Sequence, residues 1–252
     1  NNIARKGEKY DYDYEGYVDW TAGFVQAEYA FDKFSAFATF TGTKTWYRRV
    51  GNYWSAQPSF VNNSAGKSET KSFFTYTAKA GLSYSPNNRH KVFINGGYFT
   101  RPPFFRFAFV DSRYSNNYRP NLKVEKITTG EVGYSYRTSK LQANLNLYYT
   151  IWNDRTTTFD ASGAVGNDEN APRQDPGIET ALTFDGLQSV HSGVEFDVKY
   201  NVTTNLELNG FLSVGDWKWN KNVSTEFTFT DGNGVTGTRT IYVPLEGFRV
   251  GT

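Results

Sequence analysis

Apolar and polar residues alternate along much of the chain, most regularly between residues 141 and 151. In that segment the odd-numbered positions carry Leu, Ala, Leu, Leu, Tyr and Ile, whereas the even-numbered positions carry Gln, Asn, Asn, Tyr and Thr. A period of two is typical of a β-strand with one apolar face, and no helix sorts residues in this way. Similar alternation predicts about eight strands in all, the others at residues 23–31, 34–40, 74–84, 92–98, 130–136, 193–200 and 206–214.

The links between these segments differ in length. Short links with turn-forming residues lie at 32–33, 86–89, 138–139 and 203–205. Long links span residues 51–70, 101–124, 153–186 and 220 onward. Loops of that length are uncommon in compact domains, where connections of about 4–6 residues are usual. Short turns at one end of a sheet and long loops at the other are typical of outer-membrane barrels.

The charged residues inside the strands lie on the face opposite the apolar positions, as Glu28, Lys79, Glu131 and Glu195 illustrate. A barrel wall requires this sorting, because Lys or Arg facing mid-membrane lipid costs about 2–4 kcal/mol. Aromatic residues gather near strand ends, as they do in the interfacial girdles of barrels. The pattern therefore favours a transmembrane barrel over a secreted β-sandwich, in which the apolar face would form a water-excluded core.

The composition excludes several kinds of chemistry. Among 252 residues the chain has 6 Trp, 18 Tyr and 21 Phe, but no Cys and only two His. Without Cys there is no thiol nucleophile and no Cys-ligated zinc, and the two His residues have no metal-ligand spacing. A formal net charge of +2 gives no field that would recruit nucleic acid. We therefore expect no catalytic residues, metal or cofactor, and a protein that is not an enzyme.

Residues 119–134 contain Pro120-Asn-Leu-Lys-Val-Glu125 and Gly130-Glu-Val-Gly133. This stretch resembles the N-P-x-L-x-P-E … E-x-G signature of TonB-dependent outer-membrane receptors, with Val124 where Pro is usual. Residues 98–103, 145–155 and 191–197 are similar to further pieces of the same family. The order and spacing of these pieces match the family over about residues 92–200.

The resemblance implies an antiparallel, all-β transmembrane barrel of 22 strands, closed by an N-terminal plug domain that contacts TonB. About eight strands make only part of such a barrel. We therefore expect residues 1–252 to be a middle portion of the barrel domain, with the plug domain and the remaining strands absent from this chain.

The same resemblance implies an outer-membrane receptor of a Gram-negative bacterium that imports a scarce nutrient with energy supplied by TonB. The nutrient would be a metal chelate, a glycan or a peptide. The expected partners are TonB (through the plug domain), outer-membrane lipid and lipopolysaccharide, the small-molecule or oligomeric nutrient and, as a further option, a surface lipoprotein. A passive porin, a self-contained small barrel and a secreted carbohydrate-binding β-sandwich remain as alternatives.

The long links carry clusters of aromatic and basic residues. Aromatic rings supply contact area for a ligand, and Arg supplies paired hydrogen bonds. These clusters are therefore where we expect a nutrient to bind while the strands form the wall. The expected ligand-binding residues are Tyr53, Trp54, Arg101, Phe104, Phe105, Arg106, Trp152 and Arg155.

Overall fold

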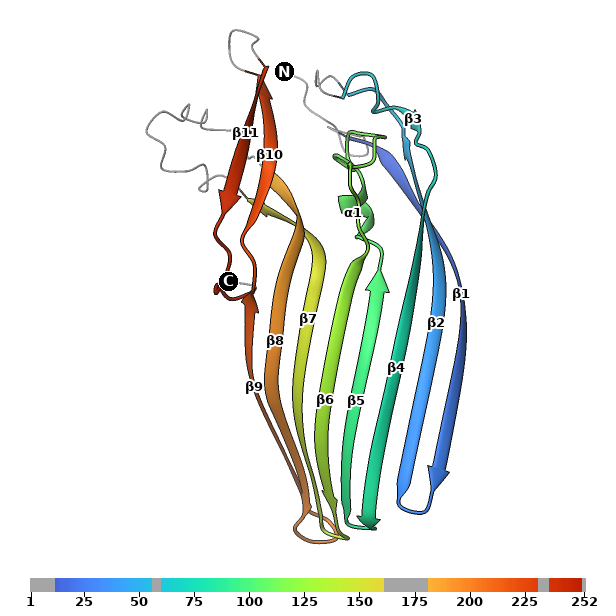
Figure 1. Cartoon of the computed structure of the whole chain (residues 1–252), viewed down its shortest axis with the longest axis vertical. Coiled ribbons are helices and arrows are strands. Elements are labelled where there is room, and N and C mark those ends of the chain that lie inside the picture. Colours follow the sequence, from blue (N-terminus) through green and yellow to red (C-terminus); the bar gives the residue numbers. More distant parts are fainter. Residues whose placement is uncertain (1–11, 56–59, 161–180, 231–235, 251–252) are drawn as a thin grey trace. The chain divides into compact units, whose positions relative to one another are not determined.

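The computed structural model describes residues 12–55, 60–160, 181–230 and 236–250. These residues are almost entirely β-structure, with one short helical turn (Figure 1). No described helix combines the length and apolar character needed to cross a membrane. The elements in chain order are β1 (Tyr14–Phe31), β2 (Phe34–Gly51), β3 (Gly66–Lys67), β4 (Lys71–Asn87), β5 (His90–Arg101), α1 (Phe105–Ala108), β6 (Glu125–Arg137), β7 (Leu141–Asp160), β8 (Ala181–Asn201), β9 (Glu207–Trp219), β10 (Val223–Thr230) and β11 (Thr236–Val243).

Eight long strands form one sheet in the order β1-β2-β4-β5-β6-β7-β8-β9, and the short β3 pairs with β2. The pairs β4–β5, β6–β7, β7–β8 and β8–β9 are antiparallel. Strands β1 and β9 stand at the two ends of this order and do not pair with each other among the described residues. The prediction of an all-β antiparallel sheet with about eight wall strands is confirmed. The open sheet is consistent with part of a larger barrel.

Two of the predicted links contain more strand than the alternation indicated. Strand β7 continues to Asp160 and β8 begins at Ala181, so treating all of residues 153–186 as a loop was wrong. The β7–β8 register shifts on both sides of Arg155, where Asp154 has φ 54°. Such bulges break the period of two, because an extra residue turns the following side chains to the other face. Beyond residue 220, β10 and β11 form a separate hairpin, and its tip at residues 231–235 lies outside the described residues.

The register aligns apolar with apolar and polar with polar positions across β6 to β9. One row contains Tyr134, Leu145, Phe196 and Leu212, and every one of these side chains is exposed. The neighbouring row on the opposite side contains Gly133, Asn146, Glu195 and Ser213. We call these two sides the apolar face and the polar face of the sheet.

The chain divides into two compact units. Unit 1 consists of Asn1–Gly23, Thr41–Tyr76 and Thr100–Val124, and unit 2 consists of Phe24–Phe40, Thr77–Phe99 and Glu125–Thr252. Each unit has its own apolar core. The buried core residues are Tyr47, Phe73, Ala108 and Phe109 in unit 1, and Phe184, Leu187, Trp219 and Val223 in unit 2.

Candidate functional site

A buried arginine joins the two long links of unit 1. Arg49, near the end of β2, is 1% exposed. Its Nε donates a hydrogen bond to the Ser112 carbonyl oxygen (2.7 Å), and its Nη1 donates to the Ser64 carbonyl (2.8 Å) and to Asn116 Oδ1 (2.6 Å). Its Nη2 donates to the Arg113 carbonyl (2.6 Å). We call this set of bonds the Arg49 clamp, and it fixes residues 60–69 and 102–122 to the same strand end.

The close packing around the clamp depends on a glycine. A Cβ atom added to Gly51 would lie 1.8 Å from the Ser64 carbonyl oxygen and 2.7 Å from Arg49 Nη1. Real Cβ atoms do not approach backbone atoms this closely, so only Gly lets the two chain segments meet at this point.

An aromatic core lies beside the clamp. Tyr47 packs against Phe73 and Phe105, with ring centroids 5.2 and 5.5 Å apart, and its hydroxyl donates to the Pro103 carbonyl (2.9 Å). Phe109 stacks on Tyr118 at 4.4 Å. The Tyr118 hydroxyl donates a hydrogen bond to the Tyr47 carbonyl (2.6 Å), and burial raises the pKa of this hydroxyl. The 102–122 loop is therefore a packed structure and not an open strand connection.

This loop covers one particular face of β2 and β4. The buried residues of these strand ends occupy odd-numbered positions, whereas Lys44, Phe74 and Tyr76 at even-numbered positions are exposed. In β4 the odd-numbered positions also carry the polar residues Lys79 and Ser83. The loop therefore packs on the odd-numbered side of β2 and β4, where the buried strand residues are Thr45, Tyr47, Arg49, Phe73 and Thr75.

Three of the expected ligand residues form a row with Phe107, at the end of β5 and the start of this loop. The guanidinium carbon of Arg101 lies 4.4 Å from the ring centroid of Phe104, and that of Arg106 lies 4.4 Å from the centroid of Phe107. The rings of Phe104 and Phe107 meet edge to face at 6.2 Å. Phe107 is buried, whereas Phe104 is 53% exposed. We call Arg101, Phe104, Phe107 and Arg106 the arginine–phenylalanine row.

The other expected residues of unit 1 have different surroundings. Trp54 is 62% exposed, and Tyr53 is half-buried. Phe105 is half-buried between Tyr47 and Phe109. Trp54 thus presents a ring to solvent, whereas Phe105 contributes mainly to the packing of the loop.

The last two expected residues lie in unit 2, at the loop ends of the strands. Trp152 Nε1 donates a hydrogen bond to Glu125 Oε2 (3.0 Å), and Glu125 is fully buried. The guanidinium carbon of Arg155 lies 4.9 Å from the ring centroid of Trp152 and 5.4 Å from that of Trp219. Arg155 therefore lies between two indole rings, and it joins Trp152 to the buried core around Trp219.

Sequence reasoning missed Tyr148 and Trp217, which lie on the polar face of β7 and β9. Trp217 Nε1 donates to the Tyr148 hydroxyl (3.0 Å). The available signal was an aromatic residue among the Asn and Gln residues of a polar strand face, which packing alone does not require.

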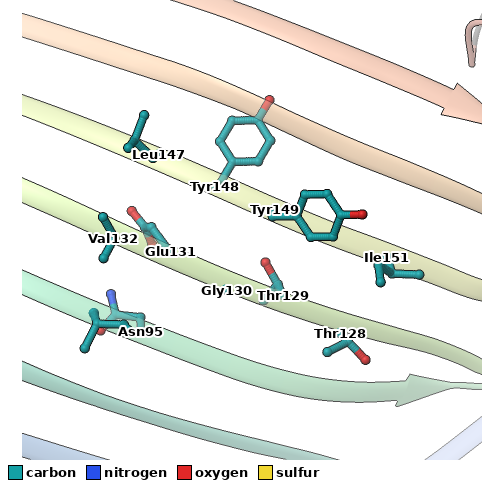
Figure 2. Close-up of a pocket in the computed structure, with 11 residues that line it drawn as sticks. Asn95, Thr128, Thr129, Gly130, Glu131, Val132, Leu147, Tyr148, Tyr149 and Ile151 are labelled. Atoms are coloured by element: carbon teal, nitrogen blue, oxygen red, sulfur yellow. The ribbon is translucent and has the colours of Figure 1, made fainter.

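The apolar face carries a shallow groove, shown in Figure 2. It lies over Gly130, where a Cβ atom would meet nothing within 4 Å. Its apolar lining comes mainly from β5, β6 and β7 and consists of Ile94, Val132, Leu147, Tyr149 and Ile151. The lining also contains the polar residues Asn95, Thr128, Thr129 and Glu131, but the groove is shallow and open and does not enclose a ligand, so we do not place the functional site there.

The family described as TonB dependent receptor-like, beta-barrel matches residues 2–252. The chain belongs to this family. Its members are transporters of the Gram-negative outer membrane and not enzymes, as the sequence predicted. The apolar face is therefore the membrane side of the wall, and the polar face is the interior side.

Three solved structures of transporters and an import receptor share the fold. The copper transporter OprC has 15% identity and a TM-score of 0.59, over 86% of this chain and 33% of its own. The FrpB iron transporter from Neisseria meningitidis (F3-3 variant) has 12% identity and a TM-score of 0.56, over 88% of this chain and 32% of its own. The ferric-catecholate import receptor Fiu from E. coli K12 has 15% identity and a TM-score of 0.58, over 95% and 35%. The chain spans about a third of each, and no curated protein matches its sequence.

Proposed function

We propose that this chain is the wall and loop portion of a receptor that imports a scarce nutrient with energy supplied through TonB. In this proposal the rest of the receptor supplies the remaining strands and a plug domain, and the plug contacts TonB. The nutrient is a metal chelate, a glycan or a peptide. The descriptions of the OprC, FrpB and Fiu structures mention copper, iron and ferric catecholate, respectively. These cargoes correspond to the first of the three nutrient classes, the metal chelates.

The observation that carries this proposal is the position of the 102–122 loop. The Arg49 clamp and the aromatic core hold the loop against the odd-numbered side of β2 and β4, and in this proposal its side chains line the route of the nutrient. Within the row, each guanidinium stacks on a ring, and a stacked guanidinium still directs its in-plane N–H groups sideways. Such N–H groups bind carboxylate, catecholate or hydroxyl oxygens. We therefore place ligand contact at Trp54, Arg101, Phe104 and Arg106, with Trp152 and Arg155 as a second contact in unit 2.

The test is uptake by whole cells that carry the full-length receptor. The probes are a ferric catecholate, a copper salt, a labelled neutral oligosaccharide and a labelled tripeptide, each with and without a protonophore. We expect at least one probe to enter only while the proton gradient is present. The Arg101→Gln, Arg106→Gln double variant should reduce that uptake about tenfold, because two charged hydrogen bonds are lost. The control Arg89→Gln, at the β4–β5 turn, makes the same kind of change at the opposite strand end and should leave uptake unchanged.

The two parts of the proposal fail separately. Uptake that continues after the gradient collapses would show a passive pore. Energised uptake that the Arg101→Gln, Arg106→Gln double variant leaves intact would instead move the binding site away from the arginine–phenylalanine row.

A further inference from the structure

We propose that Tyr148 and Trp217 form a platform on the interior face of the barrel wall on which a neutral sugar ring of the imported ligand stacks. This inference rests on the proposed import function, and it goes further in naming an additional contact and its ligand class. The platform lies entirely within unit 2, on β7, β8 and β9.

Two glycines let both rings lie flat against the sheet. Gly193 of β8 pairs with Tyr148 on one side and with Gly215 of β9 on the other. A Cβ atom at Gly193 would lie 2.5–2.8 Å from atoms of the Tyr148 phenol, so the ring rests directly on the β8 backbone. A Cβ atom at Gly215 would lie 2.9 Å from Trp217 Nε1 and 3.1 Å from the Tyr148 hydroxyl oxygen. Figure 2 shows the Tyr148 ring extending from β7 toward β8.

One hydrogen bond joins the two rings, and His191 packs beside Trp217. Trp217 Nε1 donates to the Tyr148 hydroxyl oxygen at 3.0 Å. His191 lies beside Trp217, with ring centroids 6.0 Å apart, and its Nε2 is 3.0 Å from Ser189 Oγ. Trp217 remains 49% exposed. An aromatic surface that is flat, fixed and open on one side binds the C–H face of a pyranose ring at little cost in conformational entropy.

The polar groups around the rings favour a neutral polyol over an anion. Glu131 is the register partner of Tyr148, and Glu195 lies two residues from Gly193 on the same face. Both carboxylates can accept hydrogen bonds from sugar hydroxyls, and both repel carboxylate or catecholate ligands. Lys199, farther along this face, pairs with Glu207. Arg155 lies at the loop end, between Trp152 and Trp219. Glu131 and Glu195 are thus the charged residues in the Tyr148 register row and in the row beside it, whereas the charge of Arg155 acts on His191 at the loop end, beside Trp217.

The experiment uses the purified full-length receptor in detergent and two neutral glucose hexamers of different linkage, maltohexaose and cellohexaose. Binding is measured by saturation-transfer NMR and by titration up to about 10 mM. We expect at least one hexamer to bind. Tyr148→Leu should weaken that binding about tenfold, because the stacking surface is removed. The matched control is Tyr149→Leu, because Tyr149 is the next residue and lies on the membrane side. It should leave the affinity unchanged.

A second measurement reports directly on access to the platform. Ser213→Cys places a thiol on the polar face of β9, two residues from Gly215. In the whole receptor a water-soluble maleimide should label this thiol, and bound hexamer should slow the labelling. All variants are first checked for heat-modifiable migration, which reports a folded barrel.

Three results would overturn the inference. They are binding of neither hexamer at 10 mM, equal weakening by Tyr148→Leu and Tyr149→Leu, or an introduced thiol on β9 that the maleimide never labels. Failure of the energised-import proposal would appear in a different measurement, namely uptake by whole cells that continues without the proton gradient. Binding to the purified receptor does not depend on that gradient.

Discussion

Replacing Arg49 with Met should release both long loops of unit 1 together while leaving the wall folded. The substitution leaves three buried carbonyl oxygens and Asn116 Oδ1 without their charged donor. A hydrogen bond to a charged group contributes about 1.5–3 kcal/mol, but the four values do not add, because freed loops relax and admit water. An unsatisfied buried acceptor costs about 1–3 kcal/mol, and relaxation of the loops limits the total to about 3 kcal/mol. We expect a local destabilisation of that size.

The assay is amide hydrogen exchange of the purified receptor in detergent, followed separately in residues 60–69 and 102–122. A loss of about 3 kcal/mol corresponds to roughly 100-fold faster exchange wherever local opening controls the rate. Arg49→Lys should recover only part of the protection, because an ammonium cannot reproduce the planar fork. The control Arg48→Met removes the neighbouring arginine, which stacks on Tyr17 at 4.5 Å, and should change neither segment. Faster exchange in one loop alone would refute a shared clamp.

The remaining predictions concern the wall. Leu145→Arg should block assembly of the barrel, measured by heat-modifiable migration, because an arginine facing lipid costs about 2–4 kcal/mol. Asp197→Arg on the interior face should be tolerated, and equal tolerance on both faces would contradict the assignment of the faces. Gly133→Val should lower the urea midpoint of unfolding, because a Cβ atom there would lie 2.1 Å from a ring atom of Phe93 in β5. Gly130→Val serves as the control, because a Cβ atom at Gly130 would meet nothing within 4 Å. Trp219→Ala should cost about 3–5 kcal/mol, measured as faster exchange in β10, because the indole is buried in the core that joins β8 to that strand.

Strand existence and face polarity could be predicted from the sequence because both depend on a repeat of two residues. Leu145 and Asn146 fall on opposite sides whatever the rest of the chain does, and the register places them as the alternation indicated. The extensions of β7 and β8 could not be predicted, because the bulges near Arg155 shift the repeat. The positive φ of Asp154 that accompanies them has no distinct mark in the sequence.

The candidate site was only partly accessible to the same reasoning. Aromatic and basic residues marked the 101–124 link as a region rich in ligand-binding chemistry, but their roles depend on contacts distant in sequence. Phe105 and Phe104 are adjacent and of the same type, yet one packs against Tyr47 and the other is open to solvent. Arg49 lies 63 residues before Ser112, and no local pattern announces that the two would bond.

The nature of the acceptors in the Arg49 clamp affects how such a receptor can diverge. Three of the four acceptors are main-chain carbonyl oxygens, at Ser64, Ser112 and Arg113. Every amino acid carries that oxygen, so side chains along both loops can be exchanged by mutation without removing these three bonds. The arginine and Gly51 tolerate no such exchange. Selection for a new nutrient could therefore rewrite the loop surface residue by residue while the loops keep their attachment to the wall.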